Sequence, residues 1–239
     1  MENYASVTAL PDLQVYLAGQ PVVAFDFETA PDEPYRNEAR AALDPHKAHI
    51  TGVSFSVSEG SAVYVPVAHK TGKNIECPDA LWAWLRENLF ENKSVVKVAH
   101  NLSFEVMFLY AMGIVVKAPC YDTIAAAQLT LKSKWEFRNL HDSGLKFLAT
   151  SLFCADMPSF ETVTAGRHFD EMDPQEYEAL RYASADSDYT LRLYFRFNSW
   201  FDHFLPQHRV IVEQLESPTA VYCGLMKYNG VPVDNARPP

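Results

Sequence analysis

The sequence predicts a mixed β-sheet flanked by helices, in the α/β or α+β class. Two patterns support this class. Apolar runs with strand periodicity dominate the first third of the chain, and one more strand returns between two helices before the pattern becomes helical. With 239 residues, 48% of them hydrophobic and 21% charged, the chain is long enough to bury one sizeable core.

The first half of the chain alternates strand and helix signals. We expect a brief helix over 11–18 and then a strand, buried on at least one face, over 21–28. The turn Ser58-Glu59-Gly60 is typical of a hairpin and joins two further strands, at 50–57 and 62–67. A helix, a strand and a second helix that Gly113 ends should follow, over 79–90, 94–99 and 103–112.

From Asp122 onward the pattern is helical. The run Asp173-Pro174-Gln175-Glu176 predicts a helix start, because a capping Asp is followed by Pro and by a Glu that reaches back to the cap. We detect no internal repeat. The predicted segments are helices over 123–131 and 140–152, a loop over 153–172, helices over 173–201 and 206–227, and an extended stretch over 231–234.

Composition narrows the class of protein. The N-terminus lacks a signal peptide, and no apolar run approaches the roughly 20 residues that a membrane-spanning helix needs. Four scattered cysteines fit reduced thiols, so we expect a soluble cytoplasmic protein with no membrane partner. A net charge of −10 disfavours a protein that grips long duplex DNA, but it allows an enzyme that handles a strand end, where metal ions offset charge.

Asp26 and Glu28 lie two residues apart at the end of an apolar strand, so both side chains leave the same face of the sheet. Two carboxylates about 4 Å apart repel by roughly 4 kcal/mol at an effective dielectric constant near 20. Such a pair needs a proton or a cation, and a divalent metal is the natural partner. An ordinary polar strand end is the alternative interpretation of this pair alone.

A second group of polar residues lies where a strand ends and a helix begins, at His100-Asn101-Leu102-Ser103-Phe104-Glu105. Asn101 is placed to cap the helix, and Glu105 lies one turn on, facing back toward the strand ends. Taken alone, this group also fits a capped helix start with a solvated Glu. His100 is interpreted as a hydrogen-bonding residue at the strand end.

The third group lies inside the helix predicted from Asp173. Tyr182 and Asp186 are four residues apart and share a face, whereas Asp188 points elsewhere and is assigned to the surface or to a structural role. A solvated acidic face is the alternative, but it does not explain why Tyr182 and Asp186 are interleaved with Ala183 and Ala185.

In this order and on these elements, the three groups resemble the DEDD exonuclease superfamily of the ribonuclease H-like fold. A Tyr four residues before the last Asp indicates the tyrosine branch; the histidine branch needs His where this chain has Arg181. Residues 50–57 and 62–69 look like two strands of the proofreading domain of family A DNA polymerases. The segment 215–234 looks like the passage into the polymerase domain.

This resemblance implies an α/β fold with a ribonuclease H-like mixed sheet, flanking helices and a helical C-terminal half. It divides the chain into a 3′→5′ exonuclease domain at 1–205 and a truncated start of a polymerase domain at 206–239. The implied activity is hydrolysis of phosphodiester bonds at the 3′ end of single-stranded or frayed DNA. The implied partner is a polymerase domain, in cis or as a separate chain, in a bacterial cell or a virus-infected bacterial cell.

The resemblance also assigns site residues. Two Mg²⁺ or Mn²⁺ ions would be held by four carboxylates: Asp26 on both ions, Glu28 and Asp186 on the first, and Glu105 on the second, through water. Tyr182 would orient the attacking water. This chain departs from the family pattern at Glu105, because the family usually has Asp at that position.

Three further residues match positions that bind the terminal nucleotides in the family, namely Thr29, Asn101 and Phe104. Core packing is the alternative role for Phe104, and helix capping for Asn101. Two other functions stay open at this stage: a ribonuclease D-like RNA exonuclease, which shares all three groups, and a nuclease-dead structural module of a polymerase.

Overall fold

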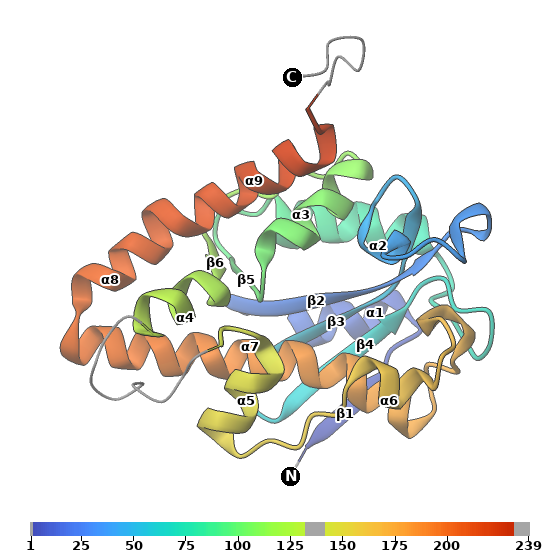
Figure 1. Ribbon diagram of the computed structural model, residues 1–239, viewed down its shortest axis with the longest axis horizontal. Helices are drawn as coiled ribbons and strands as arrows, with labels where there is room; N and C mark the ends of the chain where they lie inside the picture. Colours follow the sequence, from blue (N-terminus) through green and yellow to red (C-terminus); the bar gives the residue numbers. More distant parts are fainter. Residues whose placement is uncertain (1, 132–141, 232–239) are drawn as a thin grey trace.

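A six-stranded sheet forms the centre of the computed structural model, which describes residues 2–131 and 142–231 (Figure 1). The strand order is β1-β4-β3-β2-β5-β6. Central strand β2 is antiparallel to β3 and parallel to β5, so the sheet is mixed, as predicted. The strands are β1 Asn3–Ser6, β2 Val22–Pro31, β3 Ala48–Ser58, β4 Ser61–Pro66, β5 Val96–Ala99 and β6 Cys120–Asp122.

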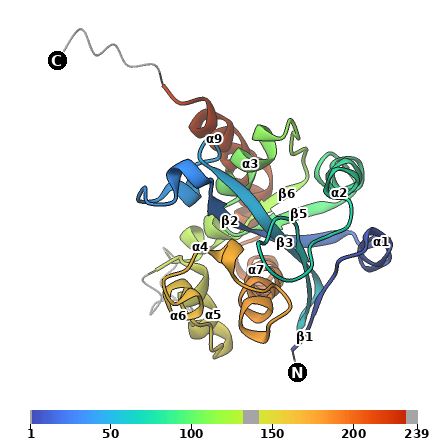
Figure 2. The same cartoon turned by 90° about the vertical axis from the view of Figure 1, so that its right-hand side faces the viewer.

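One face of the sheet is covered by α1 (Leu10–Leu17), α2 (Pro78–Leu85) and α3 (Leu102–Ala111) (Figure 2). The apolar face of β2 supplies Phe25 and Phe27 to this layer. Phe25 meets Phe90, which lies in the π-helical turn after α2, edge to face at a centroid distance of 5.2 Å. Because side chains alternate along a strand, Asp26 and Glu28 must leave β2 on the opposite face.

The opposite face is crossed by α7 (Tyr177–Phe204), a helix of 28 residues. Its apolar residues Leu191 and Phe197 form a second buried cluster with Ala24 of β2 and Val98 of β5. Shorter helices pack around α7: α4 (Thr123–Leu131), α5 (Leu145–Phe153) and α6 (Phe160–Thr164). Figure 2 shows the sheet between these two helical layers. Within the described ranges, the structure has no helix with the length and apolar content to cross a membrane.

Helix α8 (Pro206–Ile211) turns the chain back, and α9 (Ser217–Asn229) then runs alongside α3 (Figure 1). The two helices approach closely at Gly224: a Cβ atom there would lie 2.7 Å from the Ser103 carbonyl oxygen and 2.8 Å from Val106. Near the end of α9, Lys227 Nζ donates a hydrogen bond to Ser103 Oγ at 2.9 Å. Glycine at position 224 therefore permits the contact that holds α9 against the start of α3.

The main elements lie where the sequence predicts them, but short elements differ. Strands β1 and β6 were not predicted, because three or four residues carry no readable alternation. The predicted loop over 153–172 contains α6 and a 3₁₀ turn at Phe169–Glu171, so that prediction was wrong. The predicted helix over 140–152 begins only at Leu145, although its first two residues lie outside the described ranges. Most of the predicted extended stretch after 230 also lies outside them.

The predicted start of α7 at Asp173 was wrong, because the helix begins at Tyr177. Asp173 Oδ1 instead accepts a hydrogen bond from Gln175 N at 2.9 Å, which closes a turn before the helix. The Gln175 side chain accepts a further hydrogen bond, from Lys73 N at 2.7 Å. Contacts with the distant loop thus override a local capping signal. The helix also ends at Phe204 rather than near 201.

We predict that Gly224→Ala lowers the free energy of unfolding by about 1–3 kcal/mol, because the added methyl overpacks the contact between α9 and α3. Urea denaturation monitored by circular dichroism measures this. Gly144→Ala is the control, since its Cβ atom would meet Asp142 at an ordinary 3.5 Å and should change stability by less than about 1 kcal/mol. Equal effects of the two substitutions would contradict the close-packing interpretation.

Candidate metal centre and its cleft

An acidic cluster lies between β2 and α7. One ligand atom each from Asp26, Glu28 and Asp186 can be chosen so that all three lie within 4.8 Å of one another. Asp186 comes from α7, one turn after Tyr182, and both side chains are almost fully buried. The first and third groups of the sequence analysis therefore meet in space, as the shared face of the helix and the shared face of the strand require.

An irregularity in the sheet shapes the strand under this cluster. The register between β2 and β3 shifts after Glu28, so that Glu28 pairs with Gly52 and Thr29 pairs with Ile50. Such bulges re-aim side chains next to functional sites. Gly52 is required here because a Cβ atom would lie 2.1 Å from the Tyr64 hydroxyl oxygen. The bare backbone at Gly52 makes room for the Tyr64 ring beside the cluster.

Tyr64 packs in the same buried cluster as Tyr182. Both belong to one buried cluster with Phe169, whose ring centroid lies 5.7 Å from that of Tyr182. His69 Nδ1 donates to the Met172 carbonyl at 2.9 Å, so His69 Nε2 accepts from the Tyr64 hydroxyl at 2.8 Å. Burial accordingly lowers the pKa of His69 and keeps it neutral. This chain of hydrogen bonds fixes the Tyr64 ring.

The electrostatics of the cluster call for a positive charge. Burial, and then the charges of neighbouring carboxylates, raise the pKa values of Asp26, Glu28 and Glu105 well above their ordinary range. Burial raises the pKa of Asp186 to about 6, although the charge of Lys146 acts in the opposite direction. These carboxylates therefore repel one another in a space with little water.

Two oxygen atoms of these carboxylates have no partner. Asp186 Oδ1 and Glu105 Oε2 are buried without a hydrogen bond from any residue that the structure describes. Unpaired, buried, anionic oxygens are costly for a folded protein, and hard oxygen donors are the ligands that Mg²⁺ and Mn²⁺ prefer. The residues present thus fit a divalent cation.

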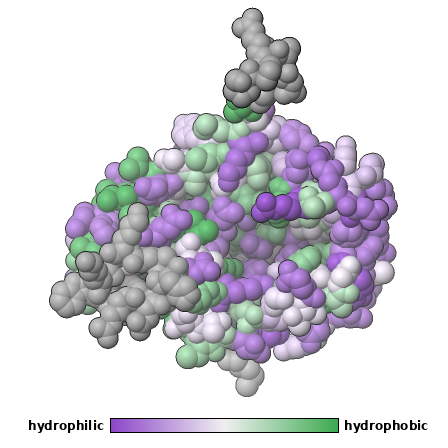
Figure 3. Space-filling view, viewed as in Figure 1, coloured by the Kyte–Doolittle hydropathy of each residue, from purple (hydrophilic) through white to green (hydrophobic). Residues whose placement is uncertain are grey.

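A cleft of about 270 Å³ opens over the cluster. Figure 3 shows the recess near the middle of this face of the molecule. Of its apolar lining residues, Leu43 and Phe160 are 50% and 38% exposed, so apolar surface faces the open space beside the carboxylates. The lining residues are Asp26, Phe27, Glu28, Thr29, Ala42, Leu43, Phe104, Phe160, Tyr182 and Asp186.

Six of the eight site residues predicted from the sequence line this cleft, and Asn101 and Glu105 do not. Glu105 lies in the first turn of α3, is 2% exposed, and senses the charge of Asp26. Thr29 lines the cleft but donates its hydroxyl to the Ala42 carbonyl at 2.7 Å. That bond fastens the turn that carries Leu43 to the end of β2.

The predicted capping role of Asn101 was wrong. Asn101 occupies the N-cap position with a left-handed backbone (φ 75°), but its side chain makes no capping hydrogen bond. Asp122 caps α3 instead, accepting hydrogen bonds at 3.0 Å from the backbone N–H groups of both Asn101 and Leu102. A cap supplied from another strand leaves no signal at the helix start. His100 does bond at the strand end as predicted, through Nδ1 and Thr123 Oγ1 at 2.8 Å.

The sequence analysis missed four residues of the cleft, Phe27, Ala42, Leu43 and Phe160. Of these, Leu43 and Phe160 are the exposed ones. Both lie in stretches without periodicity. Phe160 follows Ser159, whose Oγ accepts a hydrogen bond from Thr162 N at 3.2 Å, so a Ser-x-x-Thr helix start was the available signal. Leu43 had no such signal, because its place depends on the contact between Thr29 and Ala42.

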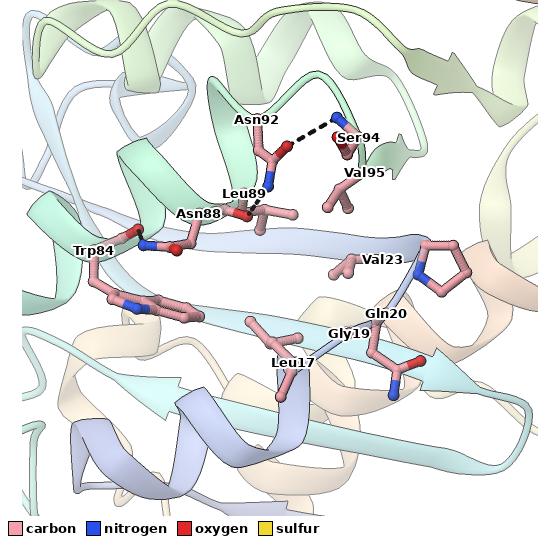
Figure 4. Close-up of a pocket in the computed structure, with 12 residues that line it drawn as sticks. Leu17, Gly19, Gln20, Val23, Trp84, Asn88, Leu89, Asn92, Ser94 and Val95 are labelled. Atoms are coloured by element: carbon pink, nitrogen blue, oxygen red, sulfur yellow. Dashed lines mark hydrogen bonds between the residues drawn. The ribbon is translucent and has the colours of Figure 1, made fainter.

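A second pocket, of about 360 Å³, lies where the chain enters β2 (Figure 4). Its walls include Leu17 and Trp84, and the side-chain amides of Asn88 and Asn92 are bonded locally. Asn88 Nδ2 donates to the Trp84 carbonyl, and Asn92 Nδ2 donates to the Asn88 carbonyl. No carboxylate or histidine lines this pocket, so the acidic cluster is the stronger candidate for chemistry.

Solved structures of other proteins share this fold. Brucella melitensis NrnC with bound Mg²⁺ matches it over 98% of both chains, with a TM-score of 0.63 and 21% identity. Escherichia coli RNase D, an exoribonuclease involved in structured RNA processing, matches 96% of this chain over 52% of its own length, with a TM-score of 0.65 and 14% identity. The fold is therefore the ribonuclease H-like fold of DEDD exonucleases, as the sequence predicted.

Sequence comparison identifies the family. Residues 4–200 match the 3′-5′ exonuclease domain family of family A DNA polymerases, and the chain belongs to that family. DNA polymerase I of Chloroflexus aurantiacus is 30% identical over 190 residues, or 78% of this chain. DNA polymerase I of Pseudomonas aeruginosa is 27% identical over 223 residues, or 89%. The chain spans about a fifth of the length of these relatives, 18% and 22% respectively.

We predict that, without divalent metal, Asp186→Asn raises the melting temperature at pH 7.5. The folded protein binds the Asp186 proton more tightly than the unfolded chain does, since the pKa rises from 3.8 to about 6. The stabilisation from protonation is therefore complete below pH 3.8 and is lost as the pH rises through 6. Asparagine mimics the protonated acid at every pH, so its advantage over the parent should shrink toward pH 4.

Calorimetry in EDTA across pH 4–7.5 measures this, and Asp188→Asn is the matched control. Asp188 lies two residues further along α7, but its carboxylate is fully paired, so its loss should lower the melting temperature at pH 7.5. Adding Mn²⁺ should stabilise the parent more than Asp186→Asn. If Asp186→Asn has a lower melting temperature than the parent in EDTA at pH 7.5, repulsion among the carboxylates does not destabilise the metal-free protein.

Proposed function

We propose that this chain is a two-metal-ion 3′→5′ exonuclease that hydrolyses phosphodiester bonds at the 3′ end of single-stranded or frayed DNA. The observation that carries the proposal is the meeting of Asp26 and Glu28 with Tyr182 and Asp186 under one cleft. The membership in a 3′-5′ exonuclease family supports the same chemistry.

In this proposal four carboxylates hold the ions. Asp26 would serve both ions, Glu28 and Asp186 would serve the first, and Glu105 would serve the second through water. When bound, Mg²⁺ or Mn²⁺ supplies hydroxide from water and stabilises charge on the departing 3′ oxygen. The orphaned oxygens of Asp186 and Glu105 support this assignment, because a cation would satisfy both.

The remaining cleft residues would hold the DNA end and the water. Tyr182, one helical turn before Asp186 on α7, would orient the attacking water. Phe104 and Phe160 offer aromatic surface for the terminal bases, an interaction worth about 1–3 kcal/mol per base and tolerant of sequence. Thr29 would contact the nucleotide through an oxygen that still has a free lone pair. Asn101 lies outside the cleft lining and would contact the nucleotide from the start of α3.

DNA is the proposed substrate because the relatives at 27–30% identity are DNA polymerases, whereas the RNA exonuclease RNase D is only 14% identical. The proposed partner is a polymerase domain, in cis or as a separate chain. Residues 1–205 would then be the exonuclease domain, and 206–239 the start of the polymerase segment. The family origin supports the cytoplasm of a bacterium, or of a virus-infected bacterium, as the place of action.

An RNA exonuclease is the second candidate. Its support is the fold match with Escherichia coli RNase D, an exoribonuclease, over 96% of this chain. A nuclease-dead structural module is less consistent with the site, because all four carboxylates and Tyr182 are present.

Digestion of matched single-stranded DNA and RNA oligonucleotides, labelled at the 5′ end, tests the proposal. We expect a ladder of products shortened from the 3′ end, faster on DNA, that requires Mg²⁺ or Mn²⁺ and stops with chelator. Asp26→Ala should reduce the rate by at least about 10³-fold, and Glu87→Ala, an exposed acid after α2, should not. Intact DNA with ample Mn²⁺, or cleavage at internal positions, contradicts the proposal; faster digestion of RNA favours the second candidate.

A second prediction concerns the departure at Glu105. Glu105→Ala should lower kcat strongly with little change in KM, because the second ion stabilises charge that grows on the leaving oxygen. Glu105→Asp keeps the charge and changes only reach, so it should be tolerated or faster. Steady-state kinetics across Mg²⁺ concentrations separate the cases. Parent-like activity of Glu105→Ala would make Glu105 a structural residue of the α3 start.

A further inference from the structure

Lys146 is a cation beside the acidic cluster that the proposed chemistry does not use. It lies in the first turn of α5, and its Nζ atom stands 4.1 Å from the centre of the Tyr182 ring. Nζ also donates a hydrogen bond to the Pro158 carbonyl at 2.8 Å. Among the residues that the structure describes, Lys146 forms no ion pair, so its charge is free to act on the ring and the cluster.

The Tyr182 hydroxyl lacks a positioning hydrogen bond from any residue that the structure describes. Its direction must therefore follow from how the ring is packed. Phe160 and Phe169 hold the ring from the sides, with centroids at 6.1 and 5.7 Å. Lys146 Nζ lies nearer to the ring centre than these two centroids do, and a cation over the face of an aromatic ring is attracted by its quadrupole.

The bond to Pro158 gives Lys146 a second effect. Pro158 lies two residues before Phe160, a lining residue of the cleft. One ammonium group thus joins α5, the segment that carries Phe160, and the Tyr182 ring. Glu28 and Asp186 line the same cleft as the Tyr182 ring, and their carboxylates favour a cation in this place.

We propose that Lys146 is a positioning residue that holds the Tyr182 ring, and through it the hydroxyl that orients the attacking water. The inference rests on the proposed hydrolytic function. It assigns no direct contact between Lys146 and the substrate. If Lys146 acts in this way, removing its charge should slow the chemical step when the Tyr182 hydroxyl is present and should have little effect when that hydroxyl is absent.

A double-mutant cycle tests this prediction on the full chain. Lys146→Met keeps length and removes charge, and it should lower kcat about tenfold with KM nearly unchanged. Lys146→Arg should restore most of the rate, because a guanidinium also packs on a ring face. In a Tyr182→Phe background, Lys146→Met should cost less than about twofold. Additive losses in kcat would overturn the proposal and favour a separate role, and a rise in KM alone would favour a phosphate contact.

Thr150→Val is the matched control. Thr150 lies on the same helix and donates to the Ala155 carbonyl at 3.1 Å, so it tethers α5 to the same segment without touching Tyr182. If it lowers kcat as much as Lys146→Met does, the effect is structural and the proposal fails. NMR of ring-labelled tyrosine gives a readout without turnover: Lys146→Met should shift the Tyr182 ring signals and Thr150→Val should not. An inactive parent that shows this shift would refute the proposed function but keep the contact, and an unchanged spectrum would refute the contact.

Discussion

Repulsion among the buried and half-buried carboxylates between β2 and α7 is the constraint on which the rest of the site depends. At about 4 Å a pair of unit charges costs roughly 4 kcal/mol at an effective dielectric constant near 20, and this cluster brings three acids together. The apolar contacts further along α7, around Leu191 and Phe197, stabilise the helix where it lies. The cluster is therefore held in place by packing outside it, which leaves its own oxygens available for a cation.

Asp188 shows how the helix is anchored next to that strain. Its carboxylate is fully buried and accepts hydrogen bonds from Arg192 Nη2 at 2.9 Å, from the Tyr4 hydroxyl at 2.7 Å and from Gly60 N at 2.8 Å. These partners join α7 to β1 and to the turn between β3 and β4. Asp186, two residues earlier, leaves an oxygen unpaired. The two acids on α7 therefore differ in role. Asp188 has all its hydrogen-bond partners and is structural, whereas Asp186 keeps an oxygen available for a ligand.

The sequence predicted what depends on periodicity and on the spacing of acids, as in β2 with Asp26 and Glu28 or α7 with Tyr182 and Asp186. It failed where tertiary contacts decide. Asp122 replaces Asn101 as the cap of α3 because β6, a strand of three residues, places its carboxylate there. The start of α7 follows contacts with the loop at 72–73 instead of the local cap. Phe160 reaches the site from a stretch that was predicted as a loop, and Lys146 comes from a predicted helix whose pattern gave no sign of the site.

Helix α9 connects the site to whatever follows residue 231. Ser217 Oγ, at its start, accepts a hydrogen bond from Asp122 N at 2.8 Å, and Asp122 caps the helix that carries Glu105. Lys227, near its end, bonds to Ser103. Both ends of α9 therefore contact the residues that set the start of α3. If a polymerase domain continues the chain as proposed, a shift of that domain would displace α9. Because α9 packs on the start of α3, this displacement would move Glu105, the carboxylate outside the cluster of Asp26, Glu28 and Asp186, before it moved the cluster on β2 and α7.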